Sequence, residues 1–283
     1  LHLSIRRQRQ MCIRDSCSGM EYPMLTCIGD RADSVRTYTI FAHEIAHMWF
    51  PMQVGSDEKR SAWQDEGVAQ YLQGIALADW SNGPGDFNAT RDDYLRYSRF
   101  IAEEPILTFA DKFKGLGSYT IASYLKPVAV FMALRGIIGE DRFAEALREY
   151  GLAWRGKHPQ PEDFFYTMER VAEKDLRFFW RPWFEETGKL ELAIDTVIII
   201  GDSAEVRLER GGGIVMPIPV QVTRANGSTE LITVGESVWS DGRKKHVVVI
   251  PDGGSPVRRV RIDAEQRFPY VDRSRLEWKY IRR

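Results

Sequence analysis

The 283-residue sequence lacks an excess of charge of either sign, since 39 Lys and Arg residues oppose 40 Asp and Glu residues for a net charge of -1. This balance does not suggest nucleic acid or an anionic membrane as the main partner. No apolar stretch approaches the ~20 residues that a membrane-spanning helix requires. Cysteine is scarce as well: Cys12, Cys17 and Cys27 are an odd number crowded near one end. They do not make a disulfide framework, and they lack the paired spacing of a cysteine zinc site. We therefore expect no nucleic-acid partner and no transmembrane segment.

The first sixteen residues lack any structural period. In the run from Arg6 to Ser16, apolar residues recur at neither the helical nor the strand period, and the run has no signal-peptide pattern. It resembles translated adaptor sequence at the edge of an environmental fragment, so residues 1–16 are expected to be extraneous to the fold. A natural protein that extended further toward the N-terminus could have carried a signal peptide, so a secreted, periplasmic or membrane-associated location stays open.

The rest of the chain has the composition of a folded protein, with 43% hydrophobic and 28% charged residues. Residues 17–188 favour helices. The first helix is expected to begin at Asp33 or Ser34, both good N-caps, and to end before Pro51. The second is expected over residues 63–78, where five apolar side chains recur at helical spacing: Val68, Tyr71, Leu72, Ile75 and Ala76.

Five shorter or kinked helices are expected after the second one. Pro127 and Pro182 fall inside two of them and should kink or restart those helices. The expected ranges are 91–103, 120–138, 140–153, 161–173 and 175–186.

Beyond Gly188 the pattern changes from helical to strand-like. Short apolar or alternating runs are separated by Gly, Pro and Asn-Gly clusters, which predicts several strands. The expected strands are residues 215–223, 231–234, 246–250 and 257–262. Strands at this spacing favour a small antiparallel sandwich of about 90 residues. The fold class is therefore predicted as α+β, with a mainly helical domain at 17–188 and a β-sandwich domain at 189–283.

The clearest chemical signal is an HEIAH motif that begins at His43 and ends at His47. On a helix, positions i and i+4 share a face roughly 6 Å apart, so both imidazoles can reach one metal ion. Glu44 projects beside them, where it can take a proton from a water molecule on the metal. Glu66 follows His47 after eighteen intervening residues. A helix, a loop of about a dozen residues and a second antiparallel helix would return Glu66 to the metal as the third ligand.

A simple packing role competes with this interpretation, because HExxH also occurs by chance in amphipathic helices. The surrounding residues Phe41, Ile45, Ala46, Trp49 and Phe50 make this an apolar helix. Two histidines and a glutamate are costly there unless they are paired or coordinated. The spacing to the distal glutamate favours the metal site further.

A short segment upstream of the motif adds to this signal. Gly19, Met20 and Glu21 precede HEIAH, and Glu66 lies within the pattern W-x-D-E-G. Together these features resemble the aminopeptidase N and leukotriene hydrolase family of gluzincins, and the resemblance runs from about Ser18 to the C-terminus. It implies a thermolysin-like catalytic domain and one Zn²⁺ per chain, held by the two motif histidines and Glu66.

The resemblance also implies substrate contacts on the N-terminal side. In the family, a G-x-M-E-N segment forms an edge strand over the cleft, and its glutamate binds the free α-amino group of the substrate. Here Gly19, Met20 and Glu21 match that segment, although Gly19 directly precedes Met20 and Tyr22 replaces the asparagine. Glu21 is therefore the expected amine-binding residue.

A tyrosine of the family, followed two residues later by lysine, stabilises the tetrahedral oxyanion. Tyr124 and Lys126 match it, Pro127 stands where many relatives have glycine, and Tyr119 is a nearby alternative. A phenol suits the role because it is a neutral donor that can serve the side of the oxyanion away from the metal.

The expected function is removal of N-terminal amino acids from peptides that have a free N-terminus. A thermolysin-like endopeptidase shares the HExxH geometry but needs no amine-binding residue. Epoxide hydrolysis, performed by one branch of the family, and a non-catalytic scaffold with a structural zinc are further alternatives. Glu44 argues against the scaffold, because a structural site needs no general base.

Relatives also carry a β-rich domain ahead of Gly19, which this sequence does not show. Side-chain preference, biological substrate and oligomeric state stay undetermined.

Overall fold

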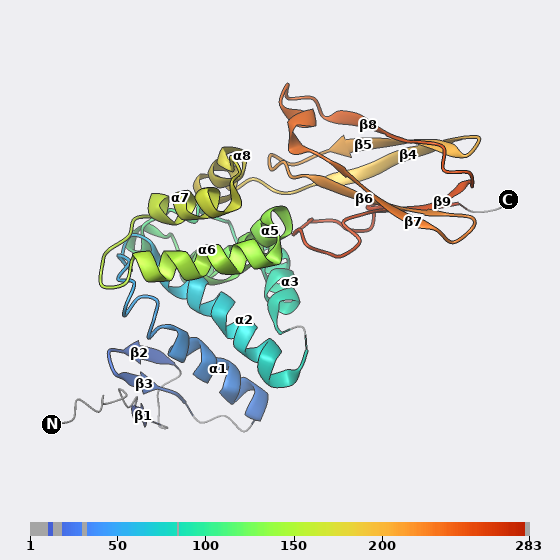
Figure 1. Ribbon diagram of the computed structural model, residues 1–283. Coiled ribbons are helices and arrows are strands. Elements are labelled where there is room, and N and C mark those ends of the chain that lie inside the picture. The colour runs from blue at the N-terminus through green and yellow to red at the C-terminus, as the bar shows by residue number, and fades with distance from the viewer. Residues whose placement is uncertain (1–10, 14–18, 30–32, 84, 281–283) are drawn as a thin grey trace. The chain divides into compact units, whose positions relative to one another are not determined.

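The computed structural model describes residues 11–13, 19–29, 33–83 and 85–280. The chain divides into two compact units, Leu1–Asp175 and Leu176–Arg283. Helices dominate the first unit and strands dominate the second (Figure 1). This arrangement confirms the predicted α+β fold class. The division falls before two short helical segments that the sequence pattern had grouped with the helical domain.

A small sheet opens the first unit. It contains β1 (Met11–Ile13), β2 (Met20–Tyr22) and β3 (Leu25–Cys27) in the order β1-β3-β2. β2 pairs with β3 in antiparallel register and β1 pairs with β3 in parallel register, so β2 is an edge strand. Of the segment 1–16, only β1 lies among the described residues. Cys27, on β3, is disulfide-bonded.

Two antiparallel helices form the frame of the first unit. α1 (Ser34–Ala46) begins where Asp33 accepts a 2.9 Å hydrogen bond from the backbone N–H of Val35, as expected of an N-cap. A π-helical turn, η1 (Trp63–Gly67), leads directly into α2 (Val68–Ser81). Near the start of α1, Tyr38 donates a 3.2 Å hydrogen bond to the carbonyl of Ala76, near the end of α2. The end of α1 therefore lies beside η1.

The predicted apolar face of α2 is only partly correct. Val68 and Tyr71 are buried, whereas Leu72 and Ala76 are half-buried. Ile75 is 45% exposed. The helix buries one side against the core, and the stripe with Ile75 borders an open groove described below.

The remaining helices of the first unit follow the predicted order. α6 begins and ends where the sequence predicted, while α3 begins and ends earlier than 91–103. Pro127 lies in the first turn of α5, directly after a π-helical turn, which agrees with a restart at proline. The elements are α3 (Phe87–Tyr97), η2 (Ala110–Lys112), α4 (Leu116–Thr120), η3 (Ile121–Leu125), α5 (Lys126–Ile138), α6 (Glu140–Ala153) and α7 (Pro161–Ala172).

The expectation that no apolar stretch is long enough to cross a membrane needs correction. The continuous helical segment Leu116–Ile138 is long and apolar enough to cross a membrane. The most apolar window of this segment is 72% buried inside the protein, and core helices can have the same length and composition. The burial therefore agrees with a core helix.

The second unit begins with aromatic residues on two short helical turns, α8 (Arg177–Trp180) and η4 (Arg181–Glu185). Phe179, Trp180, Trp183 and Phe184 are all buried, so these aromatic side chains serve the packing of the unit.

Two antiparallel sheets complete the second unit. Buried side chains alternate along β5 and β6, with Val206 and Leu208 on one strand and Val220 and Val222 on the other. This pattern agrees with the predicted sandwich, although the sequence analysis missed β4 and β5. One sheet has the order β4 (Leu192–Ile200), β5 (Ser203–Arg210), β8 (Lys245–Ile250). The other has the order β10 (Glu277–Lys279), β9 (Val257–Ile262), β6 (Ile218–Arg224), β7 (Thr229–Val234), and η5 (Glu236–Trp239) lies between β7 and β8.

Candidate metal centre

The end of α1 and the π-turn before α2 bring three potential ligands together. The Nε2 atoms of His43 and His47 lie 3.1 Å apart. Glu66 Oε2 lies 3.2 Å from His43 Nε2 and 3.4 Å from His47 Nε2. One ligand atom from each residue lies within 4.8 Å of the others. Three donor atoms therefore converge on one point, as a single metal ion would require.

A close approach of two helical segments positions Glu66. Gly67 follows Glu66 in η1, and a Cβ atom on Gly67 would lie 2.6 Å from the Cβ of Pro127. No side chain larger than hydrogen fits at this contact. η1 therefore packs directly on the turn that carries Tyr124, and the side chains of Glu66 and Tyr124 enter the same region.

Asp65 is a functional candidate that the sequence analysis missed. Its Oδ1 atom lies 2.7 Å from His47 Nδ1, and the carbonyl oxygen of Phe50 lies 2.9 Å from the same nitrogen. These acceptors favour a proton on Nδ1 and leave Nε2 free to face the ligand cluster. The position of Asp65 beside Glu66 was visible in the sequence, but no local pattern predicts its contact with His47.

The electrostatics of the cluster favour a cation. Burial alone would raise the pKa of Glu66, but hydrogen bonds with His43 and His47 lower it to about 2. Burial would lower the pKa of His47, yet Asp65 and Glu66 outweigh that effect and raise it well above the ordinary value. The carboxylates that favour a proton on His47 equally favour a metal ion among the ligands. Two imidazoles and a carboxylate also form a donor set that suits Zn²⁺.

Glu44 is buried beside this cluster. A Cβ atom on Gly19 would lie 2.5 Å from Glu44 Oε1, and Gly19 has a φ of 151°, which favours glycine. The N-terminal segment thus passes directly over the Glu44 carboxylate. Burial, opposed by His47 and reinforced by Glu21, raises the pKa of Glu44 to about 7. A carboxyl group with that pKa can both accept and release a proton near neutral pH.

Glu21 lies on the edge strand β2, next to the same carboxylates. Its carboxylate is within 4.8 Å of potential ligand atoms of Glu44 and His47, and a second such group joins it to Glu58 and Asp65. Met20 is 40% exposed on the same strand. Glu58 is a further acidic neighbour that the sequence analysis did not name. These groups form a strongly acidic cluster.

Tyr124 reaches the ligand cluster from η3. Its ring stacks on that of His43 with centroids 6.1 Å apart, and its hydroxyl lies near Glu66. Burial, reinforced by Glu66, raises the pKa of Tyr124 above its ordinary value, so the hydroxyl remains a donor. Tyr119 packs against the far side of Tyr124. Of the two tyrosines, Tyr124 is therefore the one that contacts the cluster.

The segment after Tyr124 is anchored in the core. Lys126 is fully buried, and its Nζ atom lies 3.5 Å from Glu103 Oε2. A buried ion pair of this kind strongly disfavours displacement of either partner. It therefore helps to hold the turn that carries Tyr124.

Comparisons with known proteins agree on a peptidase. The Peptidase family M1 domain matches residues 24–183. Aminopeptidase N of Streptomyces lividans is 25% identical over 175 residues, which make up 59% of this chain and 20% of that protein. The membrane alanyl aminopeptidase of Manduca sexta is 27% identical over 224 residues, or 67% of this chain and 22% of that protein. The chain thus spans about a fifth of the length of these relatives.

A solved structure shares the fold. The crystal structure of Legionella pneumophila aminopeptidase A in complex with aspartic acid matches with a TM-score of 0.67 at 17% sequence identity. The match covers 95% of this chain and 32% of that one. The two sequence relatives and the solved structure are all named as aminopeptidases. Because the family domain spans more than half of the sequence, the chain belongs to peptidase family M1.

Proposed function

We propose that this chain is the catalytic part of a zinc-dependent aminopeptidase, which removes N-terminal amino acids from peptides. The observation that carries the proposal is the convergence of His43, His47 and Glu66, whose Nε2 and Oε2 atoms lie 3.1 to 3.4 Å apart. These three residues would hold one Zn²⁺. When bound, zinc acts as a Lewis acid that acidifies water and polarises a carbonyl group.

Glu44 is proposed as the general base. Its carboxylate lies beside the ligand cluster, and its raised pKa of about 7 suits proton transfer in both directions. It would take a proton from the attacking water and then deliver that proton to the departing amine. The same residue would thus serve both halves of peptide-bond hydrolysis.

Tyr124 is proposed to stabilise the oxyanion. Its ring stacks on His43, and its hydroxyl lies near Glu66 beside the histidines. A neutral, protonated phenol can donate to a carbonyl oxygen as negative charge develops there. The rigid placement of this donor would favour the transition state over the bound substrate.

Glu21 is proposed to select the free N-terminus. Its carboxylate on β2 lies near Glu44, where it could accept hydrogen bonds from a substrate ammonium group. Gly19 and Met20 would line the same side of the substrate. With the ammonium group held there, only the first peptide bond would reach Glu44, so release would be limited to the terminal residue.

The domain assignment is proposed with the function. Residues 17–188 would form the catalytic domain and residues 189–283 a β-sandwich. Residues 1–16 would be extraneous, although Met11–Ile13 within them pair with β3. All the proposed catalytic residues lie in the first compact unit. Relatives are several times longer, so activity of the isolated chain is itself part of the proposal.

The first experiment measures hydrolysis of amino-acid 4-nitroanilides by the purified chain, beside their N-acetylated forms and a zinc determination. We expect release from the free substrates only, with zinc near one per chain. Equal release from acetylated substrates would indicate an endopeptidase. Bound zinc without turnover would indicate a scaffold role or a need for further domains, and a chain without zinc would contradict the proposal.

The Glu44→Gln variant separates chemistry from metal binding. We expect it to retain zinc and to lose turnover, because the amide cannot accept the proton. Glu145→Gln, on the exposed side of α6, is the matched control and should keep full activity. Normal turnover in Glu44→Gln would exclude this residue as the general base.

A further inference from the structure

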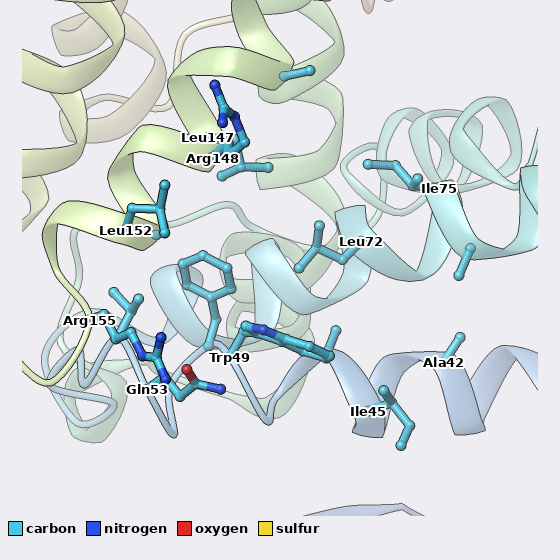
Figure 2. Close-up of a pocket in the computed structure, with 16 residues that line it drawn as sticks. Ala42, Ile45, Trp49, Gln53, Leu72, Ile75, Leu147, Arg148, Leu152 and Arg155 are labelled. Carbon is cyan, nitrogen blue, oxygen red and sulfur yellow. The ribbon is translucent and has the colours of Figure 1, made fainter. Parts of the chain in front are cut away.

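An apolar groove lies against α1, on a different face from the metal ligands. Its volume is about 570 Å³, and α1, α2, α6 and the segment that follows α1 enclose it (Figure 2). Ala42 and Ile45 of α1 line the groove, whereas His43 and His47 point to the ligand cluster. At 3.6 residues per turn these pairs lie on separate faces of the helix. The groove is therefore not part of the candidate metal centre.

Large apolar side chains border the groove and are open to solvent. Trp49 is 51% exposed, Ile75 is 45% exposed and Leu152 is 63% exposed. Single exposed apolar residues are ordinary, but several around one concave surface are typical of a binding site. The groove volume lies within the range of small-molecule pockets.

Two arginines give the groove a charged border. Arg148, on α6, and Arg155, just after it, both line the groove. Within the described part of the chain, neither guanidinium has an ion-pair or hydrogen-bond partner. Neighbouring arginines differ, since Arg142 donates to the carbonyl of Ala172 and Arg170 pairs with Glu149. The groove therefore combines apolar walls with two cations that are available to an anion.

We propose that this groove binds an amphipathic carboxylate, namely a small molecule with an unbranched apolar chain and a single acidic end group. The chain would lie along the apolar walls, and the carboxylate would pair with Arg148 and Arg155. A guanidinium presents a planar fork of donors that matches a carboxylate. The limited volume and single charged border favour such a molecule over an acidic helix or a second copy of the chain.

The test is calorimetric titration of the full chain with decanoate and with decanol, the uncharged analogue. In the Arg148→Ala/Arg155→Ala double variant we expect decanoate to bind about fivefold more weakly, whereas decanol binding should change little. Arg36→Ala/Arg60→Ala removes the same charge from exposed positions elsewhere and is the matched control. It should leave both affinities unchanged.

A second variant fills the groove without disturbing the fold. A Cβ atom on Gly151 would meet only the ring of Phe50, at an ordinary contact distance of 3.5 Å. Gly151 lies in α6, so Gly151→Leu adds bulk to the groove while favouring the helix. We expect this variant to abolish binding of both decanoate and decanol and to unfold at no lower temperature than the parent protein.

Three outcomes would overturn the proposal. The first is that decanoate shows no saturable binding below its micelle concentration. The second is that the arginine substitutions weaken the binding of decanoate and decanol equally, and the third is that Gly151→Leu leaves binding intact.

Sedimentation at several protein concentrations completes the test. A dimer that decanoate or Gly151→Leu dissociates would show that a second copy occupies the groove instead. None of these measurements depends on turnover or on zinc.

Discussion

At the residue scale, Asp65 determines which nitrogen of His47 is available to bind a metal ion. The imidazole of His47 is fully buried between Asp65 on its Nδ1 side and the cluster of His43 and Glu66 on its Nε2 side. A histidine that donates its outer N–H to a carboxylate or carbonyl keeps the other nitrogen available as a ligand. Asp65 would thus orient a proposed metal ligand without contributing an atom to the cluster of His43, His47 and Glu66.

Replacing Asp65 with Asn should weaken zinc binding by about 10- to 100-fold, because an amide is a weaker acceptor for the His47 N–H. Competition with a coloured chelator measures this affinity. Asp79→Asn, on the exposed part of α2, is the control and should bind zinc as the parent does. Unchanged affinity in Asp65→Asn would show that the carbonyl of Phe50 alone holds His47 in place.

Tyr124 and Tyr119 offer a matched pair of substitutions. Tyr124→Phe should lower kcat by about 10²- to 10³-fold with a much smaller change in KM, because the lost donor serves the transition state. Tyr119→Phe removes a hydroxyl one ring further from the ligands and should leave kcat within a few-fold of the parent. Steady-state kinetics on a 4-nitroanilide compares the two. The reverse order would assign the oxyanion role to Tyr119.

At the scale of elements, the contact between η1 and the start of α5 is the feature that assembles the site. Glu66 and Tyr124 are far apart in sequence, and each lies on a π-helical turn, η1 or η3. A π-turn changes the direction of side chains relative to a regular helix and is frequent at functional sites. The two turns meet where Gly67 lies against Pro127.

Gly67→Ala should lower the free energy of unfolding by about 1–3 kcal/mol, because the added methyl overpacks the contact with Pro127. It should also reduce turnover, since η1 must shift relative to Tyr124. Gly115→Ala is the control: a Cβ atom there has no neighbour within 4 Å. Urea unfolding should find this control within about 0.5 kcal/mol of the parent. An equal effect of both substitutions would contradict the packing argument.

At the scale of the whole molecule, the candidate metal ligands all belong to the first compact unit, so zinc should stabilise that unit alone. At a free zinc concentration of about 1,000 times Kd, binding contributes about 4 kcal/mol to the folded state. Adding a chelator should therefore lower the midpoint temperature of one calorimetric unfolding transition. The midpoint temperature of the sandwich's transition should stay the same.

A variant in the sandwich provides the complementary control. Arg224 is buried there and donates to the carbonyls of Asp202, Ser255 and Pro251 at 2.8 to 3.0 Å. Arg224→Met should destabilise the second unit by about 3 kcal/mol, because these buried acceptors lose their donor. The substitution should not change the midpoint temperature of the transition that responds to chelator. A single transition that shifts in both experiments would show that the two units unfold together.

Local pattern accounts for much of what the sequence predicted. The spacing of His43 and His47 places both imidazoles on one face of α1, since that is a property of any helix. The N-cap at Asp33 and the restart at Pro127 are likewise local, because each depends on the backbone of a few adjacent residues. The missed strand β5 also carried a local signal, since its apolar side chains alternate and are buried.

By itself, then, the sequence determined the α+β class, the helix that carries HEIAH and the candidate ligands His43, His47 and Glu66. Only the tertiary structure decided that Asp65 contacts His47, that Tyr124 lies closer to the ligands than Tyr119, and that Ile75 borders an open groove. Periodicity specifies which side chains share a face of an element. Which face meets which partner depends on close packing between segments that are distant in sequence, and no local pattern contains that information.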